Sequence, residues 1–119
     1  MTTTLRRVCL MTGPGTLPSQ GRDRMDITHY NVRFSGKGLL SAREMVEALP
    51  EINAIAEIVY DDEGANAQST HEDLRRLARK IDGVARKPDV DGIVYVQGTN
   101  TLEETAYFLN LTEIGRAHV

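Results

Sequence analysis

Two short segments rich in glycine and threonine carry residue types that can bind a small polar ligand. They are residues 13–16 (GPGT) and 98–101 (GTNT). Glycine lets backbone N–H groups approach a ligand closely, and each threonine supplies a hydroxyl group. The second segment precedes a predicted helix, whose free N–H groups and dipole favour a carboxylate or an oxyanion. For each segment alone, a turn or a helix cap is the alternative.

Neither segment matches a phosphate-binding loop. Residues 36–38 (GKG) lack the leading glycine and the hydroxyl residue of the nucleoside-triphosphate loop. Pro18 and Ser19 fall where a dinucleotide fingerprint needs its third glycine. The acidic run at 61–63 is the only candidate for a receiver-like domain, and it is typical of a solvated turn. These patterns disfavour nucleotide binding.

Alternating strands and helices are predicted to position the two segments. Apolar runs predict strands, and helical spacing with Ser41–Glu44 and Thr101–Glu104 capping boxes predicts helices. The predicted strands are 8–11, 52–60 and 93–96, and the predicted helices are 41–49, 70–83 and 101–111. This order predicts an α/β domain, a three-layer parallel sheet with helices on both faces. Ligands bind outside the carboxyl ends of such strands, where both glycine–threonine segments fall. The polar segments 17–40 and 61–69 are predicted loops.

Length and composition limit the number of domains and the kinds of partner and cofactor to expect. The chain has 119 residues, 40% of them hydrophobic and 26% charged, with a net charge of −3. One domain is expected, and this acidic balance disfavours nucleic acid and membrane surfaces as partners. The single cysteine, Cys9, forms no intramolecular disulfide, and the three histidines lack zinc spacing, so no metal or cofactor is expected. The apolar run 8–11 is too short for a signal peptide, which favours the cytoplasm.

A family resemblance adds to this interpretation. Residues 91–112 (DGIVYVQGTNTLEETAYFLNLT) closely resemble the second signature of the bacterial-type L-asparaginase/glutaminase family, whose core is H-G-T-D-T followed by E-E-T-A-Y-F-L. Residues 11–17 (MTGPGTL) are similar to its first signature, T-G-G-T-I, with one extra residue. The resemblance covers about residues 6–112. It implies the amino-terminal domain of an asparaginase-like fold and hydrolysis of a side-chain amide to the acid and ammonia, without a cofactor.

The resemblance also implies catalytic roles. Thr16 occupies the position of the family's threonine nucleophile, which forms an acyl-enzyme. A tyrosine on the following loop assists in the family; Tyr30 takes that place, with a loop anchor as the alternative. Thr99 matches the threonine of a Thr–Asp pair that acts with a lysine further along the chain.

Substrate contacts depart from the family pattern. Asn100 stands where the family has the aspartate that pairs with the substrate's α-ammonium, so recognition of a free amino acid should weaken. Gln97 replaces the usual histidine, a milder change. Asn66 aligns near the serine that holds the substrate carboxylate, whereas a shifted alignment brings in Gln68 or Ser69. These departures leave room for a related amide as substrate.

The domain is expected to be incomplete. The family's lysine and its small carboxyl-terminal domain have no counterpart here, so we expect a truncated domain at 1–112, inactive alone. Residues 113–119 are expected to be a non-native tail, because IGRAHV resembles a translated sequencing-library adapter. The resemblance implies that the full-length protein is a homotetramer, a dimer of dimers. A non-catalytic small-molecule binding or regulatory domain on the same fold is the alternative function.

Overall fold

A computed structural model describes residues 3–15, 17–23, 25–26, 28–29, 39–61 and 70–113. Strands and helices alternate along the chain. They are β1 (Arg6–Thr12), α2 (Ala42–Ala48), the short 3-10 helix η1 (Pro50–Ala54), β2 (Ala56–Tyr60), α3 (His71–Ala85), β3 (Gly92–Val96) and α4 (Leu102–Thr112). The described residues between Leu17 and Leu40 form no helix or strand, as predicted. Within the described chain, the helices are too short or too polar to cross a membrane.

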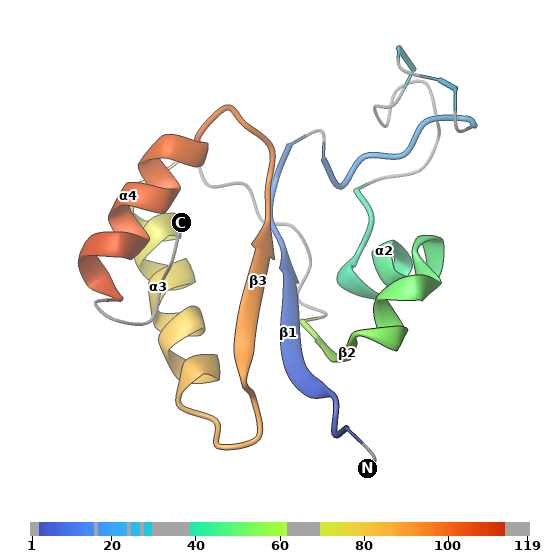
Figure 1. Ribbon diagram of the computed structural model, residues 1–119. Coiled ribbons are helices and arrows are strands. Elements are labelled where there is room, and N and C mark those ends of the chain that lie inside the picture. Colours follow the sequence, from blue (N-terminus) through green and yellow to red (C-terminus); the bar gives the residue numbers. More distant parts are fainter. Residues whose placement is uncertain are drawn as a thin grey trace.

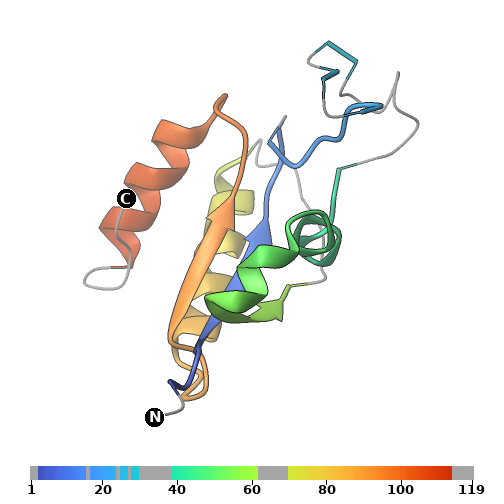
Figure 2. The same ribbon diagram turned by 45° about the vertical axis from the view of Figure 1, so that its right-hand side comes forward.

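The three strands form one parallel sheet in the order β2-β1-β3. Val8 in the central strand pairs with Ile58 on one side and with Gly92 on the other. Helix α2 lies on one face of the sheet, and α3 and α4 lie on the other (Figure 1). The view turned by 45° shows the same separation of the helices by the sheet (Figure 2). The predicted three-layer α/β architecture is confirmed.

Alternation along β1 divides the core between the two faces. Cys9 and Met11 pack toward α3 and α4, whereas Leu10 packs toward α2. Met11 is only 1% exposed. Successive side chains of a strand point to opposite faces, so the part of a central strand that is covered on both sides is apolar at successive positions. This explains the unbroken apolar run that predicted the strand.

Two local predictions were wrong. The predicted strand 52–60 begins only at Ala56, because Pro50, at the start of the preceding segment, favours the helical turn of η1. The capping box predicted at Thr101 is absent: its φ and ψ are −126° and 21°, and its side chain makes no capping bond. Capping boxes do form at Ser41 and Thr70, whose backbones are extended as a cap requires. At Thr101 a turn precedes the helix, with the Leu102 N–H bonded to the Thr99 carbonyl at 3.3 Å.

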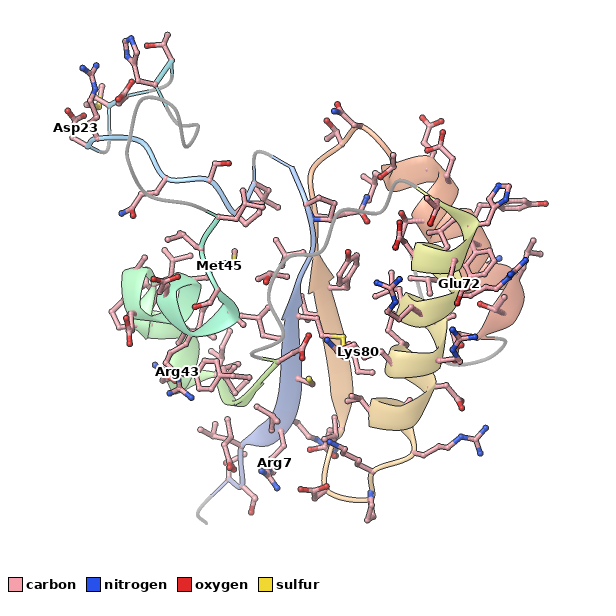
Figure 3. All side chains as sticks on the ribbon, turned by 180° about the vertical axis from the view of Figure 1, so that it is seen from behind. Arg7, Asp23, Arg43, Met45, Glu72 and Lys80 are labelled. Carbon is pink, nitrogen blue, oxygen red and sulfur yellow. The ribbon has the colours of Figure 1, made fainter. Side chains whose placement is uncertain are left out.

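Charged side chains close the amino end of the sheet. The Arg7 N–H donates to Asp91 Oδ2, and the Asp91 N–H donates to the Arg7 carbonyl, both at 2.8 Å. The Arg7 side chain also lies 2.7 Å from Asp89 and 3.2 Å from Glu57 (Figure 3 labels Arg7). The Arg7 N–H, and then the Arg6 side chain, hold the pKa of Asp91 below its usual range. The starts of all three strands are thus joined through one arginine.

Candidate functional site

The loops that follow β1 and β3 begin side by side. Thr12 pairs with Val96 at the ends of two adjacent parallel strands, so both glycine–threonine segments leave the same edge of the sheet (Figure 1). Backbone bonds continue beyond the strands. The Gly13 N–H donates to the Val96 carbonyl and the Gly98 N–H donates to the Pro14 carbonyl, each at 2.6 Å. The expectation that these two segments meet at one edge is therefore confirmed for their described residues.

The residue that is extra to the first signature, T-G-G-T-I, forms a bulge in this ladder. In a regular parallel pair one residue donates to the partner strand and its own carbonyl accepts from it. Here Gly13 donates, but the carbonyl that accepts from Gly98 belongs to Pro14. Two residues thus oppose one, which is the definition of a β-bulge. Proline suits the bulged position because it has no N–H to satisfy.

Glycine is required where the two loops touch. Gly15 has φ of 111°, a conformation that other residues rarely adopt. A Cβ on Gly15 would collide with the Cα of Gly98 and lie 2.7 Å from its nitrogen. A Cβ on Gly13 would collide with the Tyr95 hydroxyl. The two loops therefore contact each other backbone to backbone, directly before residues 16 and 99.

Two buried polar side chains lie at the base of these loops. Thr12 is 4% exposed and Gln97 is 6% exposed. Gln97 Nε2 donates to the Gly98 carbonyl at 3.2 Å. Gln97 Oε1 and Thr12 Oγ1 have no hydrogen-bond partner among the described residues. An unpaired buried acceptor costs about 1–3 kcal/mol of stability, so both atoms mark positions not optimised for folding alone.

The structure describes two of the six predicted site residues. Thr99 and Asn100 are exposed in the loop between β3 and α4, open to a ligand. Four predicted site residues lie outside the described residues: Thr16, Tyr30, Asn66 and Gln68. Their positions remain predictions.

The loop that leads toward position 30 is tied at its base and organised by one carboxylate. The Leu40 N–H donates to the Pro18 carbonyl at 2.7 Å. Asp26, whose side chain is 3% exposed, accepts from Arg22 Nε at 2.7 Å and from the His29 N–H at 2.9 Å. The Arg22 guanidinium holds the pKa of Asp26 far below its usual range. Asp23 marks this part of the chain, which lies away from the sheet (Figure 3).

Two other groups that can be reactive in proteins, a lysine and a cysteine among the described residues, are in an ion pair or buried in the core. Lys80 on α3 lies 2.7 Å from Asp61, at the end of β2 (Figure 3 labels Lys80). Burial, and then Asp61, raise the pKa of the Cys9 thiol, which disfavours the reactive thiolate. Within the described chain, no three histidine, cysteine, aspartate or glutamate side chains are grouped to hold a metal ion. The described residues that this end of the sheet does present are the Thr12 and Thr99 hydroxyls, the Gln97 and Asn100 amides and backbone N–H groups.

Gln97 and Pro14 are functional candidates that sequence reasoning did not select. The replacement of a signature histidine indicated only a mild change at position 97, and nothing in the sequence predicts the buried contact with Gly98. The extra residue in the first signature did mark position 14. Its role as a bulge depends on how β1 pairs with β3, and this pairing cannot be read from the sequence.

Comparisons with known proteins agree with this geometry. Residues 7–117 match the family described as "Asparaginase, N-terminal". The chain is 41% identical over 106 residues to L-asparaginase 2 of Bacillus subtilis, covering 87% of this chain and 26% of that protein. It is 34% identical to glutaminase-asparaginase of Pseudomonas fluorescens, covering 93% of this chain and 30% of that protein. The crystal structure of a probable cytoplasmic L-asparaginase from Campylobacter jejuni superposes with a TM-score of 0.69 at 29% identity, covering 89% of this chain and 31% of that one.

Proposed function

The chain belongs to the asparaginase family, and from this premise we propose that its full-length protein hydrolyses the side-chain amide of L-asparagine or a related amide. The products are the carboxylic acid and ammonia. The chain spans about a quarter to a third of the length of the relatives it matches. Activity is therefore proposed for the whole protein, and we propose that the 119 residues alone have none.

The observation that carries the proposal is the contact between Gly15 and Gly98. These glycines directly precede Thr16 and Thr99, the two threonines proposed to act on the amide. Hydrolysis through a hydroxyl nucleophile needs the nucleophile and its partner groups around one reacting carbon. A backbone contact one residue before each threonine supports that arrangement.

The proposed reaction proceeds in two steps. In the first, the Thr16 hydroxyl oxygen bonds to the amide carbon, its proton passes to the amide nitrogen, the C–N bond breaks, and the nitrogen leaves as ammonia. Tyr30 is proposed to assist this proton transfer. In the second, water attacks the ester, the bond to Thr16 breaks, and the acid is released with the threonine restored. Thr99 is proposed to act on the attacking water or on the leaving group together with a lysine from the rest of the protein.

Asn100, with Asn66 or Gln68, is proposed to hold the backbone groups of the substrate. Asn100 is exposed beside Thr99, which supports contact with a bound ligand. Its neutral side chain offers the substrate ammonium only a carbonyl dipole, so binding of a free amino acid is expected to be weaker than with an aspartate. Asparagine and glutamine both remain proposed substrates, since the relatives are named for either or both.

The test is ammonia release by the full-length protein and by its Thr16→Ala variant. Hydrolysis should be abolished while the variant still binds L-asparagine in calorimetry. Thr4→Ala, an exposed threonine outside the site, is the matched control and should retain full activity. Unchanged hydrolysis in Thr16→Ala would remove Thr16 from the mechanism. Binding without hydrolysis in the wild type would favour the regulatory-domain alternative.

Three further properties are proposed with the function. Cytoplasmic location is supported by the Campylobacter jejuni protein, which is named a probable cytoplasmic enzyme, whereas a Haemophilus influenzae relative is named periplasmic; cell fractionation decides between them. Light scattering of the full-length protein measures the mass of the assembly and so tests whether it is a homotetramer. Residues 113–119 are proposed to be a non-native tail, and sequencing of the native DNA tests this. A stop codon directly after the codon for Val119 would refute it.

A further inference from the structure

We propose that Gln97 is a positioning residue for this reaction: it fixes the orientation of the Gly98–Thr99 peptide group and so holds Thr99 in place at the site. The inference rests on the proposed function, because Thr99 matters only if it acts on the substrate. It concerns a buried side chain at the base of the loop, below the exposed residues Thr99 and Asn100.

The orientation of the Gln97 amide follows from its partner. Nε2 lies 3.2 Å from the Gly98 carbonyl oxygen. A carbonyl oxygen only accepts, so the amide must present its NH₂ group to it. Oε1 is then directed elsewhere, buried and without a partner among the described residues. Gln97 therefore forms this bond while leaving its own acceptor unsatisfied.

Gly98 is held on both sides by different groups. The peptide before it is fixed by the bond from its N–H to the Pro14 carbonyl at 2.6 Å. The peptide after it is fixed by Gln97 Nε2. Glycine has the widest choice of backbone conformations, so without both bonds the chain would pivot at this position.

Fixing the Gly98 carbonyl also fixes the group on the opposite side of the same peptide. In a planar trans peptide the N–H points away from the C=O. The Thr99 N–H is thus directed away from Gln97, and it has no hydrogen-bond partner among the described residues. A rotation of this peptide would move both the Thr99 N–H and the start of its side chain.

The unpaired Oε1 gives the proposal a distinctive signature. An apolar side chain at position 97 would remove this unpaired acceptor and at the same time leave the buried Gly98 carbonyl without its donor, two effects of opposite sign and similar size. A residue kept for folding alone would lose stability when replaced. A positioning residue should instead lose turnover while stability changes little.

The experiment replaces Gln97 by methionine, which has a similar length and no donor, in the full-length protein. We expect kcat for ammonia release to fall by roughly 10- to 100-fold with KM nearly unchanged, since small displacements of catalytic groups have effects of this size. The melting temperature should change little. Gln97→His, which restores the residue of the family signature and a ring N–H donor, should recover part of kcat. Gln20→Met makes the same chemical change in the loop after β1 and should leave kcat unchanged.

Crystal structures of the wild type and Gln97→Met separate this proposal from the proposed function. The variant should show a rotated Gly98–Thr99 peptide, whether or not the wild type is active. If Gln97→Met does not fold, Gln97→Leu also removes the donor without burying a charge and should lower kcat. An unchanged kcat or an unrotated peptide would overturn the positioning role. So would a fall in melting temperature large enough to account for the loss of kcat by unfolding. An inactive wild type with a rotated variant peptide would overturn only the proposed function.

Discussion

The two ends of the sheet are held together by opposite means. At the amino end, charged side chains make most of the connection: the Arg7 side chain pairs with Asp89 and Glu57, and the Asp91 carboxylate accepts from the Arg7 N–H. At the carboxyl end the loops touch through their backbones, with Gly98 bonded to Pro14 and packed against Gly15. The first end is exposed and tolerates change, whereas the second has no room for a single added methyl group.

This difference teaches where function lies in the fold. Exposed ion pairs contribute little each, and several of them together secure a boundary without demanding exact geometry. Backbone contacts between glycines bring two loops closer than any side-chain contact allows. Buried polar atoms without a hydrogen-bond partner accompany that contact, at Thr12 and Gln97, whereas Arg7 Nε at the amino end also lacks a hydrogen bond but lies 3.2 Å from the Glu57 carboxylate. The amino end is therefore secured by several weak ion pairs, whereas the carboxyl end depends on close positioning of two loops.

The largest effect is expected from Gly15→Ala in the full-length protein. The new methyl group would collide with Gly98, and φ of 111° is strained for alanine. The loops must separate, so we expect ammonia release to fall by at least roughly 100-fold. Stability should fall by about 1–3 kcal/mol in urea unfolding.

Gly83→Ala is the matched control. A Cβ at Gly83 meets nothing within 4 Å, and the residue lies inside α3. Alanine there should raise stability by about 0.5–1 kcal/mol without changing activity. Equal effects of the two substitutions would remove the distinction between a loop contact and an ordinary glycine.

The next largest effect is expected at Asn100, an exposed residue at the carboxyl end of the sheet. Asn100→Asp restores the charge of the family signature beside Thr99. A charged acceptor binds an ammonium more tightly than a neutral one by about 1 kcal/mol, so KM for L-asparagine should fall roughly 5- to 10-fold. Steady-state kinetics measures this, and an unchanged KM would mean that position 100 does not contact the substrate ammonium.

A smaller effect is expected at the amino end. Arg7→Gln removes the ion pairs to Asp89 and Glu57 and keeps the backbone bonds to Asp91. Since such exposed pairs are worth at most about 1 kcal/mol each, the melting temperature should fall by only a few degrees. The value of kcat should not change, and a large loss of activity would contradict the division between the two ends.

The smallest effect is a dependence on pH. Asp91 has a pKa lowered from the usual 3.8, mainly by the Arg7 N–H. A lowered pKa in the folded state means that the stabilisation is complete above 3.8 and is lost as pH falls through the folded-state value. Melting temperatures measured from pH 5 downward should therefore fall less steeply in Asp91→Asn than in the wild type. Identical slopes would show that Asp91 does not contribute.

The sequence predicted the architecture well because its signals are local. Unbroken apolar runs indicated strands covered on both faces, and the Ser41 and Thr70 caps began helices where expected. The Thr101 cap failed because a turn formed by contact with Thr99 changes its backbone, which no propensity expresses. The late start of β2 has the same kind of cause, a local turn that begins at Pro50.

The site was predicted only in part for a physical reason. Residue types and spacing indicated the hydroxyl groups and the two loops, and parallel strands had to bring those loops to one edge. The bulge at Pro14 and the buried bond from Gln97 depend on which residue opposes which across β1 and β3. Such register-dependent contacts follow from tertiary structure and leave no periodic signal in the chain.

The central claim is that the two threonine loops act on one bound amide. A crystal structure of the full-length protein soaked with L-aspartate, the product of asparagine hydrolysis, tests it most directly. We expect the side-chain carboxyl of the ligand to lie within hydrogen-bond distance of both the Thr16 and the Thr99 hydroxyls. A ligand that touches only one of these loops, or that binds away from the carboxyl end of β1 and β3, would contradict it.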